Sequence, residues 1–146
     1  RFSPNQFMSR AMLATVLYNL EGRPAQSLTD EFSDVDSGAW YAAGVSWAAE
    51  NGITNGYDNG KFGSDDGVTR EQFAVMLWRY AGSPAANSGA LSFVDADQAS
   101  DYAVEALRWA AANGILNGHD DGRLDSGGLT TRAQAAQILK NFMENT

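Results

Sequence analysis

The chain of 146 residues contains no cysteine, a single histidine, His119, and no long apolar run. Without cysteine, disulfide bonds, thiolate nucleophiles and zinc–thiolate sites are excluded. One histidine excludes a multi-histidine metal site. The lack of a stretch of about 18 apolar residues, and of a basic-then-apolar leader, predicts neither a membrane-spanning helix nor a signal peptide in this sequence.

Basic residues are also few, since 10 lysines and arginines stand against 18 acidic residues and give a formal net charge of −8. Phosphate backbones and anionic lipids attract basic patches, so we expect neither nucleic acid nor a membrane as partner. Apolar residues nevertheless make up 44% of the chain and aromatic residues 11%, which is too many for a disordered polypeptide. The composition therefore predicts a folded, acidic protein with a sizeable core.

An internal repeat organises the sequence. Residues 40–62 read WYAAGVSWAAENGITNGYDNGKF, and residues 102–124 read YAVEALRWAAANGILNGHDDGRL, which aligns with them without gaps at a period of 62. The opening residues 2–24 match residues 62–84 at a period of 60. We therefore predict the second half of a first copy at 1–26 and two complete copies at 27–86 and 87–146.

Each complete copy is predicted to begin with a helix of about 12 residues, at roughly 39–51 and 101–113. Gly52 and Gly114 are expected to end these helices in the left-handed conformation of a C-cap. A Gly-rich loop follows, and Phe62 is expected to anchor it in the core, as Leu124 does in the last copy.

A second helix is predicted after Ser9, Thr69 and Thr131, where a hydroxyl can cap the helix start. Gln72 and Gln134 complete capping boxes, whereas Met12 is expected to lose the reciprocal half of its cap. The repeat thus predicts an all-α fold of helix-loop-helix units, in which the first copy lacks its first helix. An upstream segment or another chain is expected to pair at that open side.

The motifs Phe32-Ser-Asp34, Trp40-Tyr…Trp47-Ala-x-x-Asn-Gly-Ile-x-x-Gly and Val68-Thr-Arg70 recur along the chain. Together they resemble the S-layer homology (SLH) repeat over nearly the whole sequence. The resemblance implies a pseudo-threefold cluster, with the second helices bundled at the centre and the first helices outside. It also implies a non-catalytic anchoring module on the bacterial cell surface, without cofactors. Its expected ligand is secondary cell wall polysaccharide on peptidoglycan, bound in grooves between repeats, often through a pyruvylated sugar.

Arg10, Arg70 and Arg132 each stand near the first position of a second helix, where the helix dipole disfavours a cation. Repetition of this unfavourable choice suggests a compensating anion. A guanidinium beside free helix-start amides could bind the carboxylate of a sugar. The alternative is a structural salt bridge to Asp34, Asp95 or another acid of a neighbouring repeat.

Four further residues are candidate ligand contacts. Asp34 and Asp95 could accept hydrogen bonds from sugar hydroxyls, or they could serve only as turn or cap residues. Trp40 and its counterpart Tyr102 could stack on a sugar ring, whereas Trp47 and Trp109 are expected in the core. Trp78 is either a groove residue or a partly exposed packing residue.

No metal or catalytic site is predicted. The alternate positions after Asp58 hold Gly60, Phe62 and Ser64, which cannot form an EF-hand loop. His119 replaces Tyr57 of the matching loop and is expected to be a variable turn residue. The family's motif glutamate is missing from all three second helices, which favours one alternative function: an SLH-like scaffold for protein–protein contacts that no longer binds polysaccharide.

Overall fold

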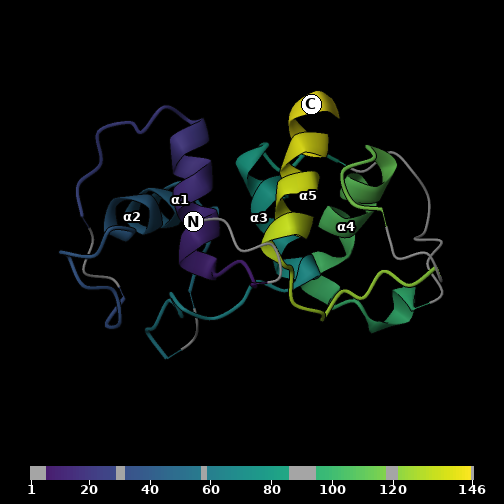
Figure 1. Ribbon diagram of the computed structural model, residues 1–146, viewed down its shortest axis with the longest axis horizontal. Helices are drawn as coiled ribbons and strands as arrows, with labels where there is room; N and C mark the ends of the chain where they lie inside the picture. Colours follow the sequence, from purple (N-terminus) through teal and green to yellow (C-terminus); the bar gives the residue numbers. More distant parts are fainter. Residues whose placement is uncertain (1–5, 29–31, 57–58, 86–94, 118–121, 146) are drawn as a thin grey trace. The chain divides into compact units, whose positions relative to one another are not determined.

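The computed structural model describes residues 6–28, 32–56, 59–85, 95–117 and 122–145 (Figure 1). Its helices are α1 (Arg10–Leu20), α2 (Ala42–Glu50), α3 (Arg70–Tyr80), α4 (Val104–Ala112) and α5 (Arg132–Asn145), with the short 3-10 helices η1 (Ala96–Gln98) and η2 (Asp101–Ala103). Extended segments in this part of the chain form isolated bridges only. The all-α prediction is confirmed.

The second helices begin at the predicted caps. The Thr69 hydroxyl accepts a hydrogen bond from the Gln72 amide at 3.2 Å, and the Gln72 side chain accepts one from the Thr69 amide at 3.0 Å. Thr131 and Gln134 repeat this box at the start of α5. One expectation was wrong: Met12 does complete the cap at α1, because its sulfur accepts a hydrogen bond from the Ser9 amide at 3.5 Å. A thioether is a weak acceptor, so this cap keeps the geometry with less energy.

The first helices end as predicted. Gly52 and Gly114 have φ values of 72° and 68°, a conformation that costs glycine no steric clash. The preceding Asn51 and Asn113 each donate a side-chain hydrogen bond at 2.8 Å back into their helix. The starts of these helices differ slightly from the expected residues 39 and 101. α2 begins at residue 42, and the 3-10 helix η2 forms the turn before α4.

The chain divides into two compact units, residues 9–67 and residues 68–146 with 1–8. The first unit contains α1 and α2, which pack on each other, and the second contains α3, α4 and α5, with α3 packed on α4 (Figure 1). α1 and α3 therefore each pack on the first helix of the following copy.

The core of residues 9–67 lies between α1 and α2. Leu13, Leu17 and Val45 are fully buried, and a buried leucine contributes about 1.5–3 kcal/mol. The rings of Tyr18 and Trp47 lie 5.7 Å apart across the two helices. Trp47 is 5% exposed and Trp109 is 4% exposed, which confirms the prediction that both are core residues.

Trp78 is a partly exposed packing residue with a defined polar contact. Its indole N–H donates to the carbonyl of Pro84 at 2.7 Å, just as the Tyr18 hydroxyl donates to the carbonyl of Pro24 at 2.7 Å. The aromatic residue thereby holds the chain that leaves its helix after the glycine turn.

In the unit of residues 68–146 with 1–8, three backbone segments are joined in a ring. The Met8 amide donates to Thr130, the Thr130 amide donates to Val68, and the Val68 amide donates to Met8, at 2.8, 2.9 and 2.9 Å. All three residues are buried. This ring lies directly before the starts of α3 and α5 and therefore fixes where Arg70 and Arg132 stand.

Candidate functional site

Each second helix begins at one of the three repeated arginines. The backbone amide of each arginine donates a hydrogen bond to a carbonyl of another copy. Arg10 donates to Asp66, Arg70 donates to Gly128, and Arg132 donates to Gln6. In α1 and α3 the next amide is also occupied, by the carbonyls of Ser64 and Ser126. The expectation of free helix-start amides was therefore wrong for these positions, because a neighbouring loop of the same chain fills them.

The Arg10 side chain is enclosed by its own unit and is only 6% exposed. Its Nε donates to the Phe62 carbonyl at 2.8 Å, and a terminal nitrogen donates to the Thr54 hydroxyl at 3.3 Å. The guanidinium also lies over the Phe62 ring, 4.8 Å from the centroid. Phe62 itself is fully buried, which confirms it as the loop anchor.

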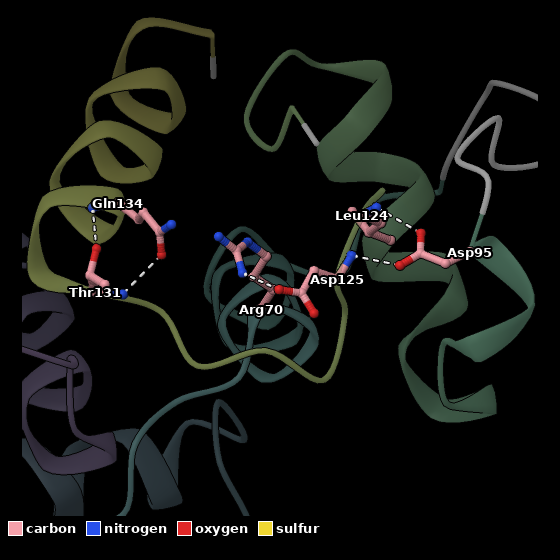
Figure 2. Close-up of polar contacts among 6 residues, drawn as sticks. All are labelled: Arg70, Asp95, Leu124, Asp125, Thr131 and Gln134. Atoms are coloured by element: carbon pink, nitrogen blue, oxygen red, sulfur yellow. Dashed lines mark hydrogen bonds and ion pairs between the residues drawn. The ribbon is translucent and has the colours of Figure 1, made fainter. Parts of the chain in front are cut away.

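Arg70 forms the salt bridge that was the alternative to ligand binding. Its guanidinium contacts the Asp125 carboxylate at 3.2 Å, and the arginine is 7% exposed (Figure 2). Burial lowers the pKa of Arg70 from its ordinary value, and the negative charge of Asp125 opposes that shift. Arg132, by comparison, is half-buried at the start of α5.

Asp34 and Asp95 serve as loop clamps. The two carboxylate oxygens of Asp95 accept hydrogen bonds from the amides of Leu124 and Asp125 at 2.7 and 2.9 Å (Figure 2). These amides, with Leu124 first, lower the pKa of Asp95 below its ordinary value. The turn or cap role considered for Asp95 was local, whereas the amides that it holds lie 29 and 30 positions along the chain, and Asp125 links Asp95 to Arg70.

Asp34 makes the equivalent clamp in the other unit. It accepts hydrogen bonds from the amides of Phe62 and Gly63 at 2.7 and 2.9 Å. Burial raises the pKa of Asp34, but the two amides outweigh that effect, so the net pKa is lowered. Both clamps hold a loop against the segment that precedes a first helix.

The two predicted stacking residues are accessible. Trp40 is 66% exposed and Tyr102 is 55% exposed. Trp40 packs edge-on against Tyr41, with ring centroids 5.2 Å apart, and the Tyr102 hydroxyl donates to Glu71 at 3.3 Å. An aromatic ring held from one side and open on the other can stack on the apolar face of a ligand.

A hollow of about 190 Å³ lies beside Arg70, in the unit of residues 68–146 with 1–8. Side chains with primary amides dominate its polar lining: Asn117, Gln134, Gln137 and Asn141. Ile115, Leu116 and Ile138 supply apolar surface. The hollow thus brings an arginine of the second copy beside a loop and a helix of the third.

The sequence did not indicate a functional role for Asp125 or for the amide side chains that line the hollow. Asp125 stands where the preceding copy has Gly63, so alignment of the two copies could have revealed an added carboxylate. The amides of Gln137 and Asn141 lie one turn apart on α5, and their side chains are hydrogen-bonded at 2.9 Å. Nothing in their spacing indicates that Arg70, more than 60 residues away, lies beside them.

Some sequence interpretations fall outside the described residues. His119, Asp58 and the acidic pair Asp120-Asp121 all belong to this group. Within the described part of the chain, no cluster of three or more metal-binding side chains occurs. None of the helices described there is long and apolar enough to cross a membrane.

These features define a class of protein: an all-helical repeat module in which a carboxylate clamps a loop within each complete copy and helix-start contacts join one copy to another. The model of the S-layer homology domain matches residues 31–74 and 92–136. The chain belongs to the S-layer homology domain family.

Surface proteins and surface enzymes are among its relatives. The chain is 30% identical over 148 residues to the surface-layer 125 kDa protein of Lysinibacillus sphaericus. It is 32% identical over 153 residues to an amylopullulanase of Thermoanaerobacterium thermosulfurigenes, and 31% identical over 150 residues to exoglucanase XynX of Acetivibrio thermocellus. These alignments cover 99–100% of this chain but only 12%, 8% and 14% of the three relatives. The chain is therefore a cell-surface anchoring module that lies outside the cell, on the bacterial surface.

Proposed function

We propose that the chain is a non-catalytic module that anchors by binding secondary cell wall polysaccharide on peptidoglycan. The observation that carries this proposal is the hollow beside Arg70, which combines amide side chains with apolar surface. Carbohydrate hydroxyls both donate and accept hydrogen bonds, and primary amides match that chemistry. The apolar walls suit the C–H faces of a sugar ring.

An anionic sugar, such as one with a pyruvate ketal, fits Arg132 better than the other two helix-start arginines. Arg10 and Arg70 are 6% and 7% exposed, whereas Arg132 is half-buried and can be approached. A guanidinium binds a carboxylate through charge-assisted hydrogen bonds. Tyr102, in the same unit, adds an exposed ring on which a further sugar can stack, and Trp40 offers a ring of the same kind in the unit of residues 9–67.

The experiment is retention of the purified chain by bacterial cell walls before and after the polysaccharide is stripped from them. We expect retention by native walls only. Arg132→Ala and Gln137→Ala should each weaken retention while the circular dichroism spectrum and melting temperature stay close to those of the parent chain. Arg108→Ala is the matched control, because Arg108 is a surface arginine paired with Glu105 at 3.3 Å.

Retention by stripped walls, or by neither preparation, would contradict polysaccharide binding. The second outcome would leave the alternative, a scaffold for protein–protein contacts. The segment before α5, residues 127–131, departs from the pattern of the other copies, but it gives that alternative no support, since Gly128 and Thr131 make the same helix-start contacts as their counterparts. The missing motif glutamates likewise leave two of the caps intact, because Gln72 and Gln134 replace them.

A further inference from the structure

Asp125 is an acidic side chain in a position that the preceding copy fills with glycine. Its φ of 58° and the φ of 76° at Gly63 are both in the left-handed region. Glycine adopts this conformation freely, but a residue with a Cβ is disfavoured there. Aspartate is one of the few other residues that adopt it, so this position can carry a carboxylate where the preceding copy has none.

Neighbouring residues hold the Asp125 carboxylate in position. The backbone amide is held by Asp95 at 2.9 Å, and the side chain reaches Arg70 at 3.2 Å. Gly128 lies so close that a side chain there would collide with the carboxylate of Asp125. In the two other copies this position is Gln6 or Asp66, so the small residue accompanies the added acid.

The salt bridge changes the charge of the hollow. Arg70 lines it, and Asp125 supplies the negative charge that an anionic ligand would otherwise bring. A ligand carboxylate that approached Arg70 would have to displace Asp125 or lie beside it, and like charges at short range repel strongly in a partly buried site.

The remaining polar groups of the hollow are neutral and offer both kinds of hydrogen bond. Gln134 uses its side-chain oxygen in the helix cap, which leaves its NH₂ group toward a ligand. Gln137 uses its NH₂ group on Asn141, which leaves its oxygen as an acceptor. Asn117 is exposed at the rim. This combination matches hydroxyl and acetamido groups of a sugar.

We propose that the hollow beside Arg70 binds a neutral, hydroxyl-bearing sugar unit and rejects one that carries a carboxylate, with Asp125 as the specificity-determining residue. The inference rests on the proposed polysaccharide function and assigns this groove to an uncharged unit of the polymer. Asp125 acts on the ligand through the charge of Arg70 and by occupying its guanidinium.

The test compares the methyl glycoside of N-acetylmannosamine with its 4,6-pyruvate ketal. The 4,6-isopropylidene ketal is the matched control, because it has the same ring and differs from the pyruvate ketal only by a methyl group in place of the carboxylate. Binding to the whole chain is followed by NMR, through the side-chain amide signals of Gln134, Gln137 and Asn141. We expect the neutral sugar to shift these signals, with an affinity about tenfold or more above that of the ketal.

Asp125→Gly restores the residue of the preceding copy at a position where glycine is unstrained. It should raise the affinity for the ketal until the preference for the neutral sugar disappears or reverses. The affinity for the neutral sugar should change by no more than about twofold, whereas loss of a merely structural residue would weaken the binding of both probes. Asp125→Asn, which keeps the side-chain volume, should give the same shift of preference. Gln137→Ala should weaken both probes equally.

Equal or tighter binding of the ketal by the parent chain would overturn the proposal, and so would an unchanged preference in both Asp125 variants. Absence of any shift of the three amide signals would also overturn it. Wall retention then tells the two proposals apart: continued retention by native walls leaves polysaccharide binding intact at another groove, and loss of retention removes both.

Discussion

At the residue scale, equivalent positions in the copies of the repeat can be compared with one another. Met8, Val68 and Thr130 occupy equivalent places in the backbone ring, and all three are buried. Thr130 alone carries a hydroxyl there, and this hydroxyl is buried without a hydrogen-bond partner in the described structure. A buried, unsatisfied hydroxyl costs stability that an isosteric methyl group does not.

Thr130→Val is therefore expected to raise the free energy of unfolding by about 1 kcal/mol, because it removes that unsatisfied group without a change of shape. Urea denaturation measures the effect. Val68→Thr is the matched control and should destabilise by a similar amount. An unchanged or lower stability of Thr130→Val would show that the Thr130 hydroxyl finds a hydrogen-bond partner in solution.

The clamp at Asp95 predicts a dependence of stability on pH. Its folded-state pKa lies below the ordinary value, so the carboxylate stabilises the fold above the unfolded-state pKa of about 3.8 and loses that effect as the pH falls through the folded-state pKa. Asp95→Asn should lower the melting temperature at neutral pH, because an amide can accept at only one oxygen.

The difference between parent and variant should shrink as the pH is lowered from about 5 to about 2.5, when the carboxylate of the parent is protonated. Melting curves at a series of pH values follow it. Asp97→Asn provides the control, since Asp97 is an exposed acid in η1. A difference that is constant over this range would mean that the charge of Asp95 contributes nothing.

At the scale of elements, α5 differs from its two counterparts in what covers it. Ala14 and Ala74 are 0% and 3% exposed on helices that pack against α2 and α4, whereas Ala136, at the same place on α5, is exposed. The same face of α5 also presents Lys140 and Met143. Small residues along a stripe allow a second helix to approach closely.

We expect a helix of the α2 type to bind this face when it is supplied. A copy of residues 32–60 joined ahead of Arg1 would place that helix in the register of the repeat. The extension should add about 2 kcal/mol of stability, because it buries apolar surface of α5, and should raise the melting temperature by several degrees.

The control carries the same extension with Trp47→Asp in the copied segment only, which removes the apolar contact. Amide hydrogen exchange in α5 should slow with the first extension and remain unchanged with the second. Equal melting temperatures for both extended chains would contradict the pairing.

At the scale of the whole molecule, we expect the chain to act as a module that can be joined to unrelated proteins, because its relatives are of different kinds. Its relatives include two carbohydrate-active enzymes and a surface-layer protein, and the aligned part is a small fraction of each. Specific contacts in a groove, and not bulk charge, are expected to hold an acidic domain to an anionic wall polymer.

The 146-residue chain fused to a fluorescent protein should therefore carry it to polysaccharide-bearing walls, while the fluorescent protein alone stays in solution. Because the contacts are mainly hydrogen bonds and stacking, retention should persist when the salt concentration is raised to about 0.5 M, at which exposed charges are screened. Release at that concentration would indicate that binding is electrostatic. Fluorescence of the sedimented walls measures both results.

Local rules were sufficient to predict the elements. The glycines that end α2 and α4, the hydroxyls that start α3 and α5, and the anchor Phe62 all follow from interactions within a few residues or from a pronounced apolar pattern. Met12 was misjudged because a sulfur acceptor is rare enough to be discounted.

The sequence by itself determined the repeat, the all-α fold and the family to which the chain belongs, because these depend on periodicity and short-range capping. Only the tertiary structure decided the partners of the functional side chains. Arg70 pairs with an acid 55 positions away, and Asp95 holds amides 29 and 30 positions away. Contacts at such separations depend on how whole copies pack, and a local pattern carries no record of that packing.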